Sequence, residues 1–342
     1  MNKIFALTTR GLESISADEI ASLPGMHITE TAYRRVAASY EGSPISLLNL
    51  RTVDDLYLDI TAWNNVIHTR DMLAVIKTWS AELDLSEAAQ ICASIRPIRN
   101  DSFSVTASFV GKRNYSADEI KTAASEGISS ANPWIYTPDD READFNIRIF
   151  IDHETAFVGV RLSKSPLHER GYKQSQRAGS LKPPVAAAML QLAEVSAGHR
   201  LLDPCCGVGT ILIEGAMMGA VASGGDLDTD AVAAAKANAN LAGVKVGIQT
   251  WDARTLPIPE RSINRIVTNL PWGRQIVVDE PLETFYGDVC GEMERVLAPG
   301  GRIAILTNTP QLLHFKQLSQ ERAIEISLFG QTPTIALYTS IR

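Results

Sequence analysis

Apolar runs alternate with helically spaced segments through the second half of the chain. The predicted strands are the mostly apolar runs at 200–205, 220–226, 244–253, 262–269, 302–308, 322–330 and 334–342. The predicted helices between them are at 209–220, 228–243, 282–298 and 310–318. Near-continuous apolar strands that alternate with helices are typical of a parallel sheet covered on both faces. The pattern therefore predicts an α/β domain with a mostly parallel sheet of seven strands, closed by a strand pair.

The first half has a different pattern, in which strands and helices are mixed without regular alternation. Apolar residues occupy every second position of 103–109 and of both arms of a predicted hairpin at 145–162. Helical spacing appears at 116–128, which begins with the capping-box pattern of Ser116 and Glu119. We expect an α+β region here.

The composition is that of a globular protein, with 45% apolar and 21% charged residues. No apolar run reaches the about 18 residues of a membrane span, and the first residues lack the long apolar region and cleavage site of a signal peptide. The four cysteines and six histidines show none of the spacings of zinc sites. We therefore expect no membrane segment, no metal and a reduced, cytoplasmic compartment.

The net charge of −7 argues weakly against a nucleic-acid partner, because phosphate binding needs Lys and Arg. One segment differs, since residues 161–182 hold six basic residues against a single acid, Glu169. The basic residues are Arg161, Lys164, Arg170, Lys173, Arg177 and Lys182. Two interpretations stay open, a solvated linker or a strip that contacts phosphates.

The stretch DPCCGVGT, residues 203–210, ends the first predicted strand of the α/β domain. Asp203 stands at the strand end, and Gly207 and Gly209 let the backbone approach a ligand closely. Position 212, where the dinucleotide-binding pattern has a third glycine, is Leu. The loop therefore favours a ligand other than a dinucleotide.

Two further acids follow at the ends of the next strands. Asp226, 23 residues after Asp203, can hold ribose hydroxyls, and Asp252 can accept a hydrogen bond from an adenine amino group. Taken alone, either acid is also compatible with an ordinary turn. Together with the loop they suit a ligand made of a cationic amino acid, a ribose and an adenine, which is S-adenosylmethionine (SAM). The predicted cofactor residues are Asp203, Cys205, Gly207, Gly209, Thr210, Asp226, Leu227, Asp252, Ala253 and Asn269.

The stretch NLPWG ends the fourth predicted strand, beside the expected position of the cofactor's methyl group. The Asn269 amide oxygen and a backbone carbonyl of Leu270 or Pro271 can accept both N–H groups of a planar amine and so orient its nitrogen. Pro271 stiffens the backbone, and Trp272 offers a face for stacking a base. We therefore predict Asn269, Leu270, Pro271 and Trp272 as catalytic residues; the alternative is a tight turn with a buried Trp.

These motifs resemble those of the THUMP-domain RNA methyltransferases that modify guanine N2 in transfer RNA. DPCCGVGT is similar to the family's cofactor motif and NLPWG to its catalytic motif, and the stretch from Phe103 to Leu162 resembles a THUMP domain. The stretch SPLHERGYKQ resembles the family's link between the two halves. The resemblance covers most of the chain. It implies a ferredoxin-like region at 1–50, a THUMP domain at 51–162, a basic linker at 163–180 and a Rossmann-like class I methyltransferase domain at 181–342.

The form Asn269-Leu270-Pro271-aromatic is most similar to the branch that acts on guanosine 6 in the acceptor stem. The guanine-10 branch usually carries Asp in place of Asn269, and the broad amino-methyltransferase motif carries Pro in place of Leu270. The resemblance implies SAM as cofactor and tRNA as partner; a need for a small activator protein stays open. The candidate RNA contacts are Lys112, Arg113, Arg170 and Lys173.

Other functions fit part of the pattern. The pattern Asn-x-Pro-aromatic is also typical of adenine-N6 and glutamine-amide methyltransferases. A guanosine at another tRNA or rRNA position is a further possible target. A non-catalytic RNA-binding subunit would have a damaged cofactor loop or catalytic motif, and neither is seen. The missing third glycine disfavours a dinucleotide-dependent oxidoreductase.

Overall fold

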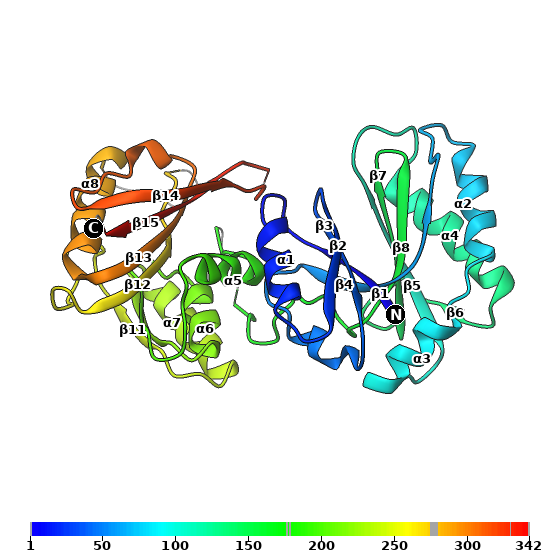
Figure 1. Ribbon diagram of the computed structural model, residues 1–342, viewed down its shortest axis with the longest axis horizontal. Coiled ribbons are helices and arrows are strands. Elements are labelled where there is room, and N and C mark those ends of the chain that lie inside the picture. The colour runs from blue at the N-terminus through cyan, green and yellow to red at the C-terminus, as the bar shows by residue number, and fades with distance from the viewer. Residues whose placement is uncertain (1, 176, 178, 274–279, 329, 341–342) are drawn as a thin grey trace. The chain divides into compact units, whose positions relative to one another are not determined.

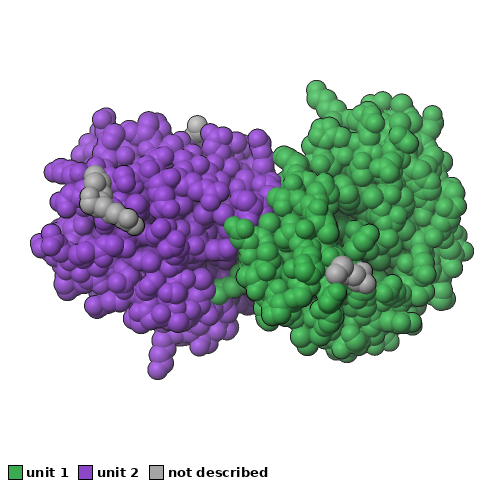
Figure 2. Space-filling model, in the orientation of Figure 1, with its two compact units in different colours: residues 1–8, 17–167 green, residues 9–16, 168–342 purple. Residues whose placement is uncertain are grey.

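The chain forms two compact units in the computed structural model, which describes residues 2–175, 177, 179–273, 280–328 and 330–340 (Figures 1 and 2). Unit 1 comprises residues 1–8 and 17–167, and unit 2 comprises residues 9–16 and 168–342. None of the described helices has the length and apolar character that crossing a membrane requires.

Unit 1 is built on one sheet with the strand order β2-β3-β1-β4-β8-β7-β5-β6 (Figure 1). Its strands are β1 (Asn2–Leu7), β2 (Met26–Ala32), β3 (Arg35–Tyr40), β4 (Asp55–Trp63), β5 (Ser102–Phe109), β6 (Ile135–Tyr136), β7 (Phe145–Asp152) and β8 (Thr155–Arg161). Its helices are α2 (Met72–Ala81), α3 (Ser86–Ile95) and α4 (Ala117–Ala131), with a 3-10 turn η1 (Pro44–Asn49). The pairing is antiparallel except at β5, which runs parallel to β6 and β7.

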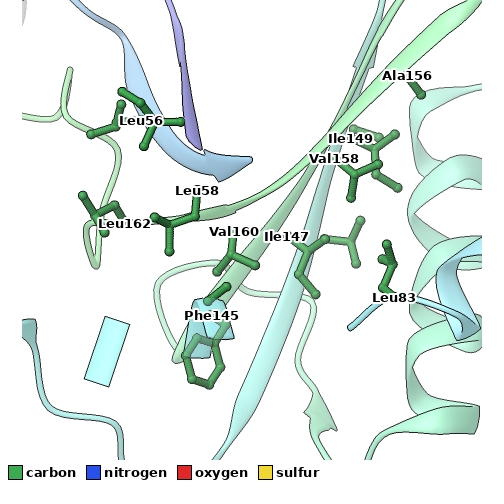
Figure 3. Packing of buried hydrophobic residues seen from close by; sticks show 14 of the residues in the cluster. Leu56, Leu58, Leu83, Phe145, Ile147, Ile149, Ala156, Val158, Val160 and Leu162 are labelled. Atoms are coloured by element: carbon green, nitrogen blue, oxygen red, sulfur yellow. The ribbon is translucent and has the colours of Figure 1, made fainter. Parts of the chain in front are cut away.

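The predicted hairpin is confirmed as β7 and β8, and its alternation sets the core of unit 1. Ile147 and Ile149 of β7 and Val158 and Val160 of β8 gather on one side of the sheet (Figure 3). They belong to the same core cluster as residues of α2 and α4. The predicted capping box at the start of α4 is also confirmed, with both reciprocal hydrogen bonds formed.

Unit 2 contains a seven-stranded sheet with the order β11-β10-β9-β12-β13-β15-β14. Its strands are β9 (Arg200–Asp203), β10 (Val221–Asp226), β11 (Gly247–Thr250), β12 (Ile263–Asn269), β13 (Leu297–Thr307), β14 (Leu318–Glu325) and β15 (Thr334–Ser340). Its helices are α5 (Pro183–Leu192), α6 (Thr210–Met217), α7 (Thr229–Leu241) and α8 (Leu282–Val296). β9 to β13 pair in parallel, and β15 runs antiparallel to both neighbours, so the predicted mostly parallel sheet and its closing pair are confirmed.

Neighbouring residues of the central strands face opposite sides of this sheet. Leu201 and Val267 belong to the core cluster with α5, α6 and α7, whereas Leu202 and Ile266 belong to the cluster with α8. Both faces are therefore covered by helices, as the apolar strands predicted.

One predicted helix differs from the structure. The helix predicted at 310–318 is wrong: only a 3-10 turn η2 (Pro310–Leu312) forms, and β14 begins at Leu318 because it pairs with β15. The segment 50–100, for which the sequence predicted little, contributes β4 to the middle of its sheet. The predicted strand ends at 329 and 341–342 lie outside the described residues.

Residues 9–16, which include the start of α1 (Glu13–Ala21), pack in unit 2. Leu12 and Ile15 are buried in its core, and Ser327 N donates to the carbonyl of Arg10 at 3.0 Å. At Gly11, with φ +94°, a Cβ would lie 2.1 Å from the Glu325 carbonyl oxygen. Only glycine fits this approach.

The sequence-based division of the chain into domains at 50/51, 162/163 and 180/181 stays a prediction.

Candidate active site

The strand order of unit 2 reverses between β9 and β12, which is the topological switch point of the sheet. A cavity of about 420 Å³ is lined by the carboxyl ends of β9, β10 and β12. Open α/β sheets bind ligands at this position, and pockets of about 300–1,000 Å³ hold small molecules. The described part of unit 2 therefore has a ligand-sized cavity where the sequence motifs converge.

The glycine loop forms one wall of the cavity. Gly207 has φ +52°, and its N–H donates to the Asp226 carboxylate at 2.9 Å. Gly209 has φ +82° and caps the N-terminus of α6. The indole N–H of Trp251 donates to the Pro204 carbonyl at 3.0 Å. These contacts hold the loop's backbone against the cavity.

Asp203 lines the cavity at the end of β9, and its side chain is buried. Cys205 N donates to its Oδ1 at 3.3 Å. Burial raises the pKa of Asp203 to about 7, because a charged carboxylate is poorly solvated there. Burial also raises the pKa of the neighbouring Cys205 and Cys206 thiols, so both stay protonated at neutral pH and are poor nucleophiles.

Asp226 lines the cavity at the end of β10, with its oxygens 2.9 Å from Gly207 N and 3.0 Å from Asp228 N. A carboxylate has about four lone-pair sites, so acceptor capacity remains for ligand hydroxyls. Leu227 beside it is 67% exposed and also lines the cavity. An exposed Leu next to a carboxylate offers an apolar surface for a flat ring.

Asp252 lines the same cavity but has a partner that the sequence analysis missed. Both of its oxygens accept from the Arg254 guanidinium, at 2.6–3.0 Å, and Arg254 also contacts Glu280 at 2.6 Å. Hydrogen bonds from Arg254 lower the pKa of Asp252. Asp252 is therefore a fixed carboxylate, while Ala253 is buried and is not among the lining residues.

The predicted catalytic turn leaves β12 at the cavity. Asn269 and Pro271 line the cavity, whereas Leu270 is 1% exposed and does not. Leu270 N donates to the Leu306 carbonyl at 3.2 Å, which fixes the turn to β13. Trp272 is half-buried against the core cluster of α5, α6 and α7, and it is not among the lining residues.

Three buried polar atoms of cavity-lining residues have no hydrogen-bond partner among the described residues. They are Ser180 Oγ, Thr210 Oγ1 and Asn269 Oδ1. A buried polar atom left without a partner costs about 1–3 kcal/mol. Their gathering at one cavity indicates a ligand with several polar groups.

Comparisons with known proteins agree with this geometry. Residues 170–327 match the family model described as "RMKL-like, methyltransferase domain" (UPF0020). A tRNA (guanine(6)-N2)-methyltransferase of Thermus thermophilus is 34% identical over 216 residues, which are 62% of this chain and 64% of that protein. The chain thus matches a little under two thirds of that relative's length.

The solved structure of TrmN from Thermus thermophilus is 27% identical and has a TM-score of 0.81, with all of both chains covered. This chain is therefore similar to TrmN over its whole length. SMU.472, a methyltransferase solved with S-adenosylhomocysteine (SAH), has a TM-score of 0.76 at 18% identity over 100% of this chain and 98% of that one. That likeness shows the fold alone.

The lining of the cavity fits SAM, the cofactor that the sequence analysis predicted. Four carboxylates line it, those of Asp203, Asp226, Asp228 and Asp252, against the two guanidinium groups of Arg177 and Arg254. SAM carries a sulfonium and an ammonium group against one carboxylate, so an acid-rich lining matches its net charge. The unpartnered hydroxyls and amide add acceptors for its polar atoms.

The sequence analysis missed the segment 177–181, which it assigned mostly to the linker. Arg177, Gly179, Ser180 and Leu181 line the cavity, and Arg177 forms an ion pair with Asp228 at 2.7 Å. Composition marked this segment only as basic, and nothing local in the sequence connects it with a cavity formed by β9 and β10.

Asn238 of α7 joins Ser175, which precedes this segment, to the glycine loop. Its Oδ1 accepts from Ser175 N at 3.2 Å, and its Nδ2 donates to the carbonyls of Ser175 at 3.3 Å and Val208 at 3.1 Å. Asn238 is almost fully buried. It therefore holds Val208 of the cavity wall to the backbone of Ser175.

The four predicted RNA contacts differ in their surroundings. Arg170 lies 3.3 Å from the buried Glu214 carboxylate, and Lys173 donates to the Leu181 carbonyl. Burial lowers the pKa of Lys173 to about 8. The Arg113 guanidinium donates to the carbonyls of Val66, Ile67 and His153, whereas Lys112 is exposed. Arg113, Arg170 and Lys173 thus have structural partners, and phosphate contact by these four stays a prediction.

Within the described residues, no group of three His, Cys, Asp or Glu side chains has the arrangement of a metal site.

Proposed function

We propose that this protein transfers the methyl group of SAM to the exocyclic N2 of a guanosine in tRNA, at position 6 of the acceptor stem. The observation that carries the proposal is the amide oxygen of Asn269, which is buried at the ligand cavity without a donor among the described residues. A target amine supplies that donor. The 34% identity to an enzyme named for guanosine 6 supports the choice of nucleotide.

Bound SAM supplies an electrophilic methyl group and leaves as SAH. The protein must orient the target amine, because the nitrogen lone pair is delocalised into the ring and is a weak nucleophile. Asn269 Oδ1, with one backbone carbonyl of the turn, accepts both N–H groups and so directs the nitrogen lone pair at the methyl carbon. The nitrogen becomes acidic on methylation and releases one proton, so no strong base is required.

The cofactor is held by the acids at three strand ends. Asp203, once ionised, accepts from the ammonium group of the amino-acid part. Asp226 accepts from the ribose hydroxyls and Leu227 packs on the adenine, whose amino group donates to Asp252. Thr210 and Ser180 have hydroxyls without described partners at the cavity, and these are available to the same ligand.

The target guanosine must leave its helix to reach the turn, because N2 of a paired base is not accessible to a buried amide. We assign Trp272 as the stacking partner of the flipped base. Its indole Nε1–H is buried without a partner among the described residues. On this proposal, unit 1 helps to capture the tRNA substrate. The protein then acts in the cytoplasm, where tRNA is found.

The test is incubation of the purified protein with labelled SAM and unmodified tRNA, followed by nucleoside mass analysis. N2-methylguanosine, mapped to position 6 in nuclease fragments and absent with a tRNA altered at that position, supports the proposal. N6-methyladenosine, or label at another guanosine, would replace the target. Tight SAM and tRNA binding without transfer would identify a binding subunit.

The matched variant is Asn269→Ala. Loss of the amide acceptor should lower the transfer rate by about 10²–10³-fold with SAM affinity nearly unchanged, because one fixed acceptor of the transition state is removed. An unaltered rate would refute the catalytic assignment.

A further inference from the structure

A chain of hydrogen bonds runs through the core of unit 2 to the turn that carries Asn269. Thr309 N lies 3.0 Å from Thr307 Oγ1 at the end of β13, and Thr307 Oγ1 lies 2.6 Å from the Tyr286 hydroxyl of α8. The Tyr286 hydroxyl lies 3.0 Å from the Pro271 carbonyl oxygen. Tyr286 and Thr307 are both 0% exposed, so water cannot replace these contacts.

The direction of the chain follows from counting protons. The Pro271 carbonyl only accepts, and each hydroxyl has a single proton to donate. Tyr286 therefore donates to Pro271, Thr307 donates to Tyr286, and Thr309 N donates to Thr307. Burial raises the pKa of the Tyr286 phenol, so it keeps its proton at neutral pH.

These contacts pin the turn at two points. The Leu270 N–H is held by the Leu306 carbonyl of β13, and the Pro271 carbonyl is held by Tyr286 of α8. The Asn269 side chain leaves the turn just before the first point, and the Trp272 indole leaves just after the second. The β12–β13 pairing fixes the backbone at Asn269, and the orientation of the Pro271 carbonyl and of Trp272 after it depends on the contact with Tyr286.

We infer that Tyr286 is a positioning residue for methyl transfer: its hydroxyl, oriented by Thr307, fixes the Pro271–Trp272 peptide so that the turn presents its acceptors to the target amine. This inference rests on the proposed function. Tyr286 itself does not line the cavity and touches no reactant. Its effect should therefore appear in the rate of the chemical step and not in cofactor binding.

The experiment is a double-mutant cycle on the full-length protein with Tyr286→Phe and Thr307→Val. Single-turnover transfer to tRNA is measured at saturating SAM, SAM affinity by calorimetry and stability by thermal melting. Tyr286→Phe keeps the buried ring and removes one hydroxyl. We expect a rate about 10–30-fold lower, since misplacing an acceptor by a fraction of an ångström has effects of this order, with SAM affinity changed less than about twofold.

Thr307→Val should give a smaller loss, because Tyr286 then keeps its bond to Pro271 but loses the donor that orients it. The double variant should be no slower than Tyr286→Phe, since Thr307 acts through Tyr286. Thr307→Ser keeps the hydroxyl and should restore the wild-type rate. Tyr338→Phe is the matched control, because that hydroxyl contacts Gln320 of β14 at 3.3 Å.

A Tyr286→Phe protein that melts earlier but transfers at the wild-type rate would overturn the inference, and so would additive rate losses in the cycle. If the wild-type protein transfers no methyl group to tRNA, the proposed function fails and the inference falls with it. If wild-type transfer is robust and the variants match it, the inference alone fails.

Discussion

Acidifying the solution from pH 7 to pH 5 is expected to weaken SAM binding through one carboxyl, that of Asp203. This side chain is 1% exposed, and burial raises its pKa to about 7. It can hold the ammonium group of SAM only when ionised. The apparent Kd for SAM should therefore scale with the inverse of the ionised fraction of Asp203. Compared with the Kd of the fully ionised protein, it should be about 10-fold higher at pH 6 and about 100-fold higher at pH 5.

The ligand's own amine does not obscure this window, because an α-amino group titrates near pH 7.7–8.0 and is protonated throughout it. Calorimetric titration of the protein with SAM at half-unit intervals from pH 5 to 7 measures the slope. Asp203→Asn is the matched variant. Its affinity should be independent of pH and close to that of wild type at pH 5, where the wild-type carboxyl is also neutral.

Asp203→Asn, which should weaken SAM binding at neutral pH, should at the same time stabilise the cofactor-free protein. The folded-state pKa of about 7 lies above the ordinary 3.8, so the favourable contribution of the protonated group is present below pH 4 and is lost as pH rises through 7. This difference corresponds to at most about 4 kcal/mol. Asp203→Asn should therefore melt at a higher temperature than wild type at pH 8. A flat Kd between pH 5 and 7, or an Asn variant with the wild-type slope, would refute the reasoning.

Three further substitutions test the contacts that shape the two units. Asn238→Asp removes both hydrogen bonds that the side chain donates to Ser175 and Val208 and should weaken SAM binding about 10-fold, measured by calorimetry, with an unchanged Kd counting against the role of these contacts. Gly209→Ala places a residue with a Cβ at φ +82°, and that Cβ would lie 3.0 Å from Ala235 Cβ. Urea unfolding should therefore show a free energy of unfolding lower by about 1–3 kcal/mol, and an unchanged value would contradict that account. Asp55→Ala removes one of the two carboxylates that contact the buried Arg161 guanidinium at 2.6 Å, leaving Asp140 as the other, and should destabilise unit 1 by about 1–3 kcal/mol in the same assay, whereas Asp55→Asn should lose less.

Much of unit 2 could be predicted from the sequence because its signals are local. Each parallel strand is an apolar run, and Asp228 caps α7 through Ala231 N and Asp230 N within three residues. The positions of Asp203, Asp226 and Asn269 followed from one rule, that carboxyl ends of parallel strands meet at one edge. The cavity with these residues in its lining is the result.

The remaining features depend on contacts between segments that are distant in the sequence. Arg254 engages Asp252 together with Glu280. Leu181 joins the cavity lining through the core cluster that it shares with α6 and α7. Tyr286 reaches Pro271 only because α8 lies against β12 and β13. Periodicity carries no information about such partners, since it reports which face of an element is apolar and not what covers it. The amino-acid sequence thus determined the strands, the caps and the order of the acids that line the cavity, while tertiary packing decided which side chains hold the turn after β12 and which close the cavity.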